Sequence, residues 1–182
     1  MVMIVNDVKE VLFSKEQLAQ RCRELGKVIS EDYRGKDLVL VGILKGSVVF
    51  MTDLMKEITI PVMLDFMAVS SYGMETSSSG VVKIIKDLDM DIEGKYILIV
   101  EDIIDSGLTL SYLIEYLKAR KAAAIDIVCL LDKKERRKKD IPVKYKGFDV
   151  PDEFIIGYGI DYAEKYRNLP FVASLKEEVY MK

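Results

Sequence analysis

The chain has 182 residues, is 50% hydrophobic and carries a formal net charge of −3 at pH 7. This length favours a single domain over residues 1–182, and the mild negative charge argues against a protein-wide surface for nucleic acid. Histidine is absent, which excludes Ser-His-Asp and Cys-His catalytic arrangements and histidine-ligated zinc. Acid–base chemistry would therefore fall to carboxylates, lysines or tyrosines.

Two cysteines and the N-terminal segment indicate the cellular setting. Cys22 and Cys129 fit no metal or redox spacing, and we interpret them as buried, reduced thiols. The opening MVMIVNDVKEVLF lacks a basic segment followed by a long apolar run, and no run reaches membrane-spanning length. We expect a cytoplasmic protein that does not associate with membranes.

Three elements are predicted in the first sixty residues. Residues 14–33 begin with S-K-E-Q, a capping box opened by Ser14, which predicts an amphipathic helix. The apolar residues expected on its buried face are Leu18, Cys22, Leu25, Val28 and Ile29. LVLVGI at 38–43 is typical of a buried strand, and VVFMTDLMKEI at 48–58 predicts a helix that returns along the sheet.

The remainder of the chain continues this alternation of strands and helices. A helix is predicted from SGLTLSYLIEYLKAR at 106–120, and strands are predicted at 62–72, 81–88, 95–100, 123–131 and 153–160. GMETSSSG at 73–80 is too polar and small to support a core, so we predict a mobile loop over about 71–81. Apolar strands alternating with helices favour an α/β fold with a mostly parallel sheet.

ILIVEDIIDSGLTL at 97–110 carries the clearest functional signal. Ligands of open parallel sheets bind beyond the carboxyl ends of the strands, and Ser106, Gly107 and Thr109 offer hydroxyls and amide N–H groups at a helix N-terminus, which favours a phosphate. Because the nearby acids would repel a phosphate, Glu101 and Asp102 are expected to bind ribose hydroxyls or Mg²⁺. The alternative is surface acids beside an ordinary helix cap.

VEDIIDSGLTL resembles the phosphoribosyl pyrophosphate motif of the type I phosphoribosyltransferases, especially the purine enzymes that use hypoxanthine and guanine. The resemblance implies a mostly parallel sheet flanked by helices, a flexible catalytic loop, and a small hood built from the N-terminal residues and about 150–182. It also implies Mg²⁺-dependent purine salvage, in which phosphoribosyl pyrophosphate and hypoxanthine or guanine give IMP or GMP plus pyrophosphate. A homodimer or homotetramer is the family expectation.

The same resemblance implies roles for the phosphate-binding residues. Asp105 would transfer a proton at purine N7, and Glu101 and Asp102 would face ribose and metal. The 5-phosphate would be bound by Ser106, Gly107, Leu108 and Thr109, although many family members carry threonine where this chain has Ser106. LKGS at 44–47 resembles the pyrophosphate loop, with a non-proline cis peptide between Lys45 and Gly46. Arg167 would bind pyrophosphate as well.

Further motifs follow in the order that the family uses. Lys133, in LLDKKERRKK, would donate to the 6-oxo group of the purine, and the rest of this basic run is interpreted as solvated. PDEFIIGYGIDYAEKYRNLP at 151–170 resembles the base-binding segment, so Phe154 would stack on the purine and Ile155 would read its edge. Asp161 would contact a second metal ion or the exocyclic amine of the base. Ser71 and Tyr72 match the start of the catalytic loop.

Two alternatives remain open from the sequence. The same chemistry on xanthine or uracil would need few changes, and a regulator of this fold could sense phosphoribosyl pyrophosphate and bind RNA through KKERRKK at 133–139. Taken singly, Phe154 is more typical of a core residue and Arg167 of a surface ion pair. Their joint placement after a matching strand favours the functional roles instead. Asp105, the Ser71-Tyr72 loop and the lack of an added DNA-binding domain favour the enzyme over the regulator.

Overall fold

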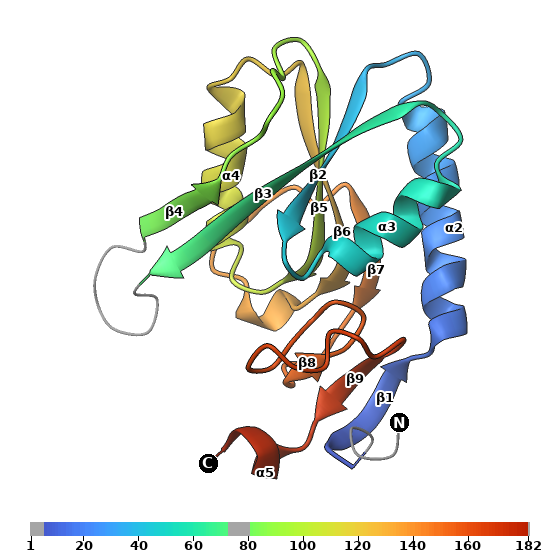
Figure 1. The fold of residues 1–182 in the computed structure, drawn as a ribbon, viewed down its shortest axis with the longest axis vertical. Coiled ribbons are helices and arrows are strands. Elements are labelled where there is room, and N and C mark those ends of the chain that lie inside the picture. The colour runs from blue at the N-terminus through green and yellow to red at the C-terminus, as the bar shows by residue number, and fades with distance from the viewer. Residues whose placement is uncertain (1–5, 73–80, 182) are drawn as a thin grey trace.

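The computed structural model describes residues 6–72 and 81–181 and contains a central six-stranded sheet (Figure 1). Along the sheet the strand order is β4 (Val81–Lys86), β3 (Val62–Tyr72), β2 (Leu38–Leu44), β5 (Tyr96–Ile104), β6 (Ala124–Asp132) and β7 (Tyr145–Asp149). Only β4 runs antiparallel to its neighbour; all the other pairs are parallel. The predicted α/β class and mostly parallel sheet are confirmed.

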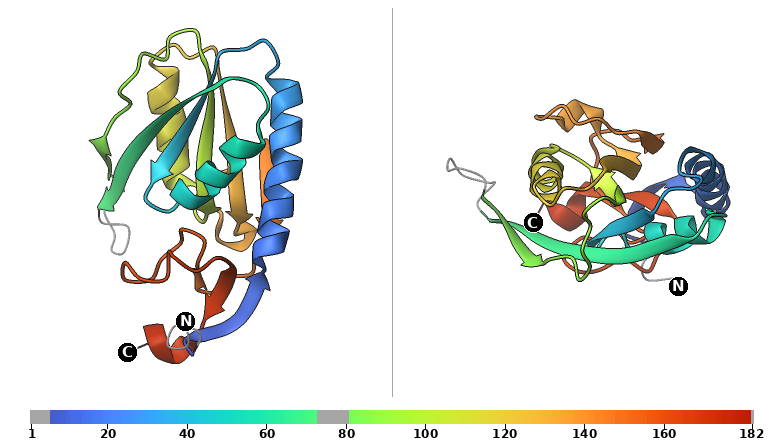
Figure 2. Two further views of the ribbon diagram at one scale, coloured as in Figure 1. Left: turned by 45° about the vertical axis from the view of Figure 1, so that its right-hand side comes forward. Right: turned by 90° about the horizontal axis from the view of Figure 1, so that it is seen from above.

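Helices cover both faces of this sheet. α2 (Lys15–Asp32) and α3 (Val48–Glu57) pack on one face, and α4 (Leu108–Lys118) packs on the other (Figures 1 and 2). The strands are apolar on both sides because successive side chains point to opposite faces. In β5, Leu98 faces the α2 and α3 side, whereas Ile97 and Ile99 face the α4 side.

A second, three-stranded antiparallel sheet lies beyond one end of the main sheet (Figure 1). It consists of β1 (Val8–Phe13), β9 (Val172–Leu175) and β8 (Ile155–Ile156), and the short helix α5 (Glu177–Tyr180) follows it. We call this sheet, α5 and the segment 157–171 the hood. The hood therefore pairs β1, near the N-terminus, with β9, near the C-terminus.

The N-terminal helix begins where its capping box predicts. Gln17 donates its N–H to the Ser14 side chain at 3.3 Å, and the Gln17 side chain accepts from the N–H of Ser14 at 2.8 Å. Leu18, Cys22, Leu25 and Ile29 are buried as predicted. Val28 is not, since it is 45% exposed on the side of α2 that faces away from the sheet.

The predicted strand over 153–160 is wrong beyond its centre, because only Ile155–Ile156 pair as a strand. The chain then turns: Gly157, Tyr158 and Gly159 have φ values of 92°, 50° and 100°, and Gly157 donates its N–H to the carbonyl of Ile160 at 2.9 Å. Positive φ is incompatible with extended structure. The predicted mobile segment at 73–80 lies outside the described residues. No described helix has the length and apolar character needed to cross a membrane.

Candidate active site at the carboxyl end of the sheet

Three neighbouring parallel strands deliver the candidate residues to one edge of the sheet. β2 ends at Leu44, β5 ends at Ile104 and β6 ends at Asp132, and β5 pairs with both of the others. In parallel strands these carboxyl ends meet at the same edge. The loops that follow β2, β5 and β6 therefore face one another beneath the hood.

The loop between β5 and α4 turns sharply at Gly107. Gly107 has a φ of 78°, and a Cβ there would lie 2.9 Å from the carbonyl of Lys139, so only glycine fits. The Ser106 side chain accepts the N–H of Leu108 at 3.4 Å. A cavity of about 230 Å³ lies against this loop and is lined by Glu101, Ile103, Ile104, Asp105, Ser106, Gly107, Thr109 and Leu110.

The basic run after β6 buttresses this loop. Lys138 and Lys139 donate their backbone N–H groups to the carbonyl of Ser106 at 2.9 and 3.1 Å. Arg137 pairs with the buried carboxylate of Asp132 and donates to the carbonyl of Asp105 at 3.3 Å. The interpretation of this run as mostly solvated is therefore wrong for Arg137, because its guanidinium satisfies a buried acid and a loop carbonyl.

Glu101 and Asp102 are adjacent acids in an environment that disfavours negative charge. Burial raises the pKa of Glu101 well above its usual range, and the charge of Asp102 raises it further. Burial also raises the pKa of Asp102 to about 6, against the lowering effect of the N–H groups of Asp102 and Ile103 and of the Arg167 guanidinium. A bound cation would relieve this cost, so the pair fits a divalent metal ion.

The turn after β2 packs tightly against Asp102. A Cβ at Gly46 would lie 2.1 Å from Oδ2 of Asp102, and a Cβ at Gly159 would lie 2.1 Å from the carbonyl oxygen of Gly46. The non-proline cis peptide is present, but it joins Leu44 and Lys45 rather than Lys45 and Gly46. The sequence could not locate it because neither residue is proline and the surrounding packing selects the isomer.

Arg167 approaches the same turn from the hood. It donates to the carbonyl of Gly159 at 2.8 Å and pairs with Asp161 at 2.7 Å. Its Nε is buried and has no hydrogen-bond partner among residues 6–72 and 81–181. An unpaired buried donor is costly, so this nitrogen points to a missing acceptor. Asp161 already binds Arg167 through one oxygen and the N–H of Glu164 through the other.

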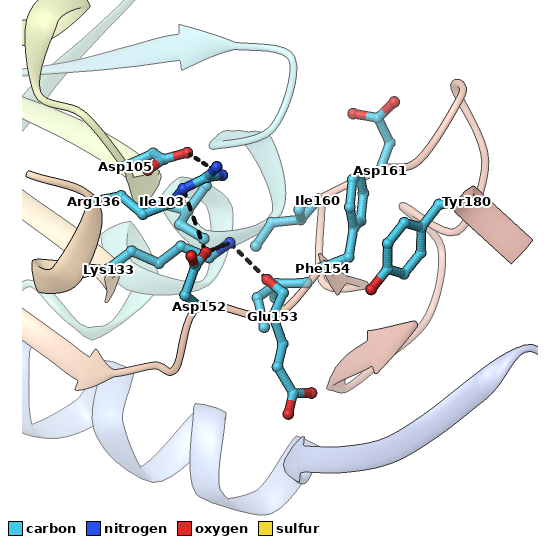
Figure 3. A pocket seen from close by; sticks show the side chains of 11 residues that line it. Ile103, Asp105, Lys133, Arg136, Asp152, Glu153, Phe154, Ile160, Asp161 and Tyr180 are labelled. Carbon is cyan, nitrogen blue, oxygen red and sulfur yellow. Dashed lines mark hydrogen bonds and ion pairs between the residues drawn. The ribbon is translucent and has the colours of Figure 1, made fainter. Parts of the chain in front are cut away.

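A larger cavity of about 510 Å³ lies between β5, β6 and the hood (Figure 3). Lys133 forms part of its wall, donates to the carbonyl of Glu153 at 2.6 Å and lies 3.9 Å from Asp152. Burial lowers the pKa of the Lys133 ammonium. Ile103 and Asp105 line both this cavity and the smaller one, so the two spaces adjoin at these residues.

Phe154, directly before β8, and Tyr180 of the hood form an aromatic wall opposite Lys133 (Figure 3). Phe154 is 37% exposed, so it is not the core residue that its type alone would predict. Its ring stacks on Tyr180 with centroids 4.9 Å apart and meets Tyr162 edge-on at 5.1 Å. Ile155 is 4% exposed and lines the cavity beside it. A flat ring could insert along this wall.

Several residues of this cavity were not predicted from the sequence. They are Ile103, Arg136, Asp152, Glu153, Ile160 and Tyr180. Arg136 pairs with Asp105 and with Asp152, each at 3.4 Å. Its position three residues after Lys133, at the end of a buried strand, was the available signal. No sequence pattern predicts Tyr180, which belongs to the last helix, α5.

The catalytic-loop residues and the predicted metal ligands are less completely defined than the other predicted site residues. β3 ends at Ser71 and Tyr72, whose backbones pair with Val82 and Val81, but their side chains and the loop that follows lie outside the described part of the chain. Among residues 6–72 and 81–181, no three cysteine or acidic side chains gather as a metal site. Glu101, Asp102 and Asp161 therefore do not form a closed cage, and a metal ion there would need oxygens from a substrate.

Comparisons with known proteins agree with this geometry. Residues 10–163 match the family model described as "Phosphoribosyl transferase domain". The chain is 54% identical over 175 residues to the hypoxanthine-guanine phosphoribosyltransferase of Staphylococcus aureus, covering 96% of this chain and 98% of that protein. It is 52% identical to the bifunctional protein TilS/HprT of Listeria monocytogenes, of which it spans only 27%.

Solved structures give the same result. A hypoxanthine phosphoribosyltransferase from Staphylococcus aureus superposes with a TM-score of 0.94 at 54% identity, covering 97% of this chain and 96% of that one. The Trypanosoma cruzi hypoxanthine phosphoribosyltransferase in a ternary substrates complex gives a TM-score of 0.91 at 39% identity, covering 96% and 99%. The likeness therefore extends over nearly the whole chain.

Proposed function

The chain belongs to the phosphoribosyl transferase domain family, and we propose that it is a purine-salvage enzyme that transfers the 5-phosphoribosyl group of phosphoribosyl pyrophosphate to N9 of hypoxanthine or guanine. The products are IMP or GMP and pyrophosphate. The observation that carries this proposal is the position of Asp105, which lines both the small cavity at the phosphate loop and the large cavity with the aromatic wall. A nucleotide has its phosphate, sugar and base in that order.

Phosphate and ribose bind at the carboxyl end of β5. The loop Ser106–Thr109 receives the 5-phosphate through its N–H groups and hydroxyls at the start of α4, where the helix dipole favours an anion. Glu101 and Asp102 orient the ribose hydroxyls and would hold Mg²⁺, with Asp161 as a further acid near the site. When bound, Mg²⁺ supplies positive charge that stabilises the diphosphate as it leaves.

Pyrophosphate binds between the β2 turn and the hood. Lys45 and the N–H groups beside Gly46 face the diphosphate, and the unpaired Nε of Arg167 gains an acceptor when it binds. These donors stabilise the charge that accumulates on the leaving group as carbon 1 of the ribose becomes electron-poor. Ser71 and Tyr72 begin a loop that closes over the reacting centre.

The base binds in the larger cavity. Phe154 and Tyr180 contact its faces and edge, and Ile155 lies beside it. The Lys133 ammonium donates to a 6-oxo group, in addition to the Glu153 carbonyl that it already contacts. Adenine, with a donor at that position, would place an amino group against this ammonium instead of an acceptor. Asp105 transfers the proton at N7, a role that only a carboxylate, lysine or tyrosine can fill in a chain without histidine.

The test is an ultraviolet assay of the purified protein with phosphoribosyl pyrophosphate, Mg²⁺ and single bases. We expect turnover with hypoxanthine and guanine, and none with adenine or uracil. A preference for xanthine or uracil would replace the base assignment, and no turnover with any base would refute the enzyme. The comparisons do not favour an RNA-binding regulator. We propose a cytoplasmic homodimer or homotetramer, which light scattering of the same sample tests.

A further inference from the structure

Glu164 lies between the two cationic side chains that we assign to pyrophosphate. Its Oε2 is 3.2 Å from Nζ of Lys45 and 3.4 Å from Nη2 of Arg167. These cations come from segments far apart in the sequence, the β2 turn and the hood, and the Glu164 carboxylate is the group that bridges them. On the basis of the proposed function, we infer that Glu164 is an internal competitor for pyrophosphate, occupying part of its site until the diphosphate displaces it.

The backbone presents Glu164 in a fixed direction. Tyr162 and Lys165 exchange backbone hydrogen bonds at 3.2 and 3.0 Å, which closes a two-residue turn. The central residues, Ala163 and Glu164, have φ values of 50° and 61°. Turns of this kind prefer glycine or asparagine, because other side chains are strained at positive φ. A strained turn that carries a carboxylate into an anion site points to function rather than to stability.

The ion pairs of Glu164 are strong enough to form and weak enough to be replaced. The hydrogen bond from Lys45 lowers the pKa of the Glu164 carboxyl, so it is ionised near neutral pH. The side chains of Lys45 and Glu164 are 67% and 65% exposed, and exposed pairs contribute little to stability. A diphosphate offers more charge and more acceptor oxygens than one carboxylate.

Arg167 remains in place when the carboxylate leaves. Its Nη1 is held by the carbonyl of Gly159, its Nη2 also binds Asp161 at 2.7 Å, and its Nε is still without an acceptor. Displacement of Glu164 therefore frees Lys45 and part of the Arg167 fork without loosening the guanidinium. The competition is electrostatic, and removing the charge at position 164 should strengthen pyrophosphate binding.

The experiment is calorimetric titration of Mg²⁺-pyrophosphate into the wild-type protein, Glu164→Gln and Glu93→Gln. Glu93 is the matched control, since it pairs with Lys121 at 3.3 Å with 60% and 74% exposure and precedes the amino end of β5, at the opposite end of the sheet from the site. We expect Glu164→Gln to lower the pyrophosphate Kd by about three- to tenfold, as expected for the loss of two exposed competing pairs, and Glu93→Gln to leave it unchanged. Product inhibition by pyrophosphate should strengthen to the same extent.

An unchanged or higher Kd for Glu164→Gln would overturn the inference, and a higher Kd would make Glu164 a ligand-binding residue. Glu164→Gly, which relieves the positive φ as well as removing the charge, should give the same lower Kd, so that an effect seen only with glycine would assign the result to backbone strain. The proposed function is tested separately by the turnover assay. Absence of turnover with every base would refute the enzyme, whereas the pyrophosphate Kd values decide whether Glu164 competes with the diphosphate.

Discussion

Gly46 and Asp102 are packed so closely that a Cβ at position 46 would lie 2.1 Å from Oδ2 of the aspartate. The turn after β2 and the acid on β5 therefore share one space, although 56 positions separate them in the chain. Gly159 of the hood also packs closely against the carbonyl of Gly46. This contact fixes the pyrophosphate side of the site relative to the ribose side.

Gly46→Ala is therefore expected to displace Asp102 or the turn, and to lower kcat/KM by about 100-fold, the cost of misplacing reacting groups by roughly 1 Å. Gly35→Ala is the matched control, because its Cβ would meet nothing within 4 Å. The control has a φ of 75°, so it should lose some stability without losing activity. Thermal unfolding and steady-state kinetics of both variants provide the check, and full activity in Gly46→Ala would contradict the close packing.

Asp105→Asn should lower the rate of the chemical step without weakening substrate binding. The amide keeps the size of the carboxylate at the junction of the two cavities but cannot take up a proton, so we expect kcat to fall by about 10²- to 10⁴-fold. The Kd of phosphoribosyl pyrophosphate, measured by calorimetry, should change little. Because Arg136 pairs with Asp105 at 3.4 Å, Arg136→Gln is a useful companion and should reduce kcat less. Wild-type turnover in Asp105→Asn would remove this residue from the mechanism.

The elements that could be predicted from sequence are those whose patterns are local. Strands buried on both faces, such as β2 and β5, are continuous apolar runs, and the Ser14 capping box marks the start of α2. β1 and β9 were not predicted, because each is short and pairs with a strand from the opposite end of the chain. Their stability comes from that distant partner, which no window of sequence contains.

The site residues also fall into those that the sequence could predict and those that it could not. Lys133 and Asp105 follow strand ends directly, so their positions could be predicted from strand order and family resemblance. Tyr180 and Arg136 reach the base cavity through tertiary packing of α5 and of the turn after β6, and no spacing rule places them there. The cis peptide was predicted one position too late for a similar reason, since peptide isomer is not encoded by the type of a single residue.

Lys133→Met tests the recognition of the purine 6-oxo group. Methionine retains the apolar stem but removes the ammonium, which donates to the Glu153 carbonyl at 2.6 Å. We expect the KM for hypoxanthine to rise by about 10- to 100-fold, as for the loss of a charged hydrogen bond, and discrimination against adenine to shrink. Burial lowers the pKa of this lysine, which means that its charge is costly in the folded protein. The variant lacks this charge and should unfold at no lower temperature than the wild type. Lys134→Met, on the exposed neighbour, is the control; an unaltered base profile in Lys133→Met would refute the role.

Asp53→Asn tests how α3 holds the hood. Asp53 accepts hydrogen bonds from Tyr158 and Lys56, each at 2.7 Å. Burial acts to raise the pKa of Asp53, but these two donors outweigh it, and the pKa lies below its usual value of 3.8. A carboxyl with a lowered folded pKa stabilises the protein fully above its unfolded pKa, and this contribution disappears as the pH falls through the folded pKa.

The variant should therefore be less stable than the wild type at pH 7, by no more than about 1 kcal/mol because the pair is partly exposed to solvent. The difference should narrow below pH 4, where the wild-type carboxyl becomes protonated. Urea unfolding of both proteins between pH 3 and 7 measures this, with Tyr158→Phe as the control that removes one donor and retains the acid. A stability difference that stays constant with pH would show that the Asp53 charge does not hold the hood to α3.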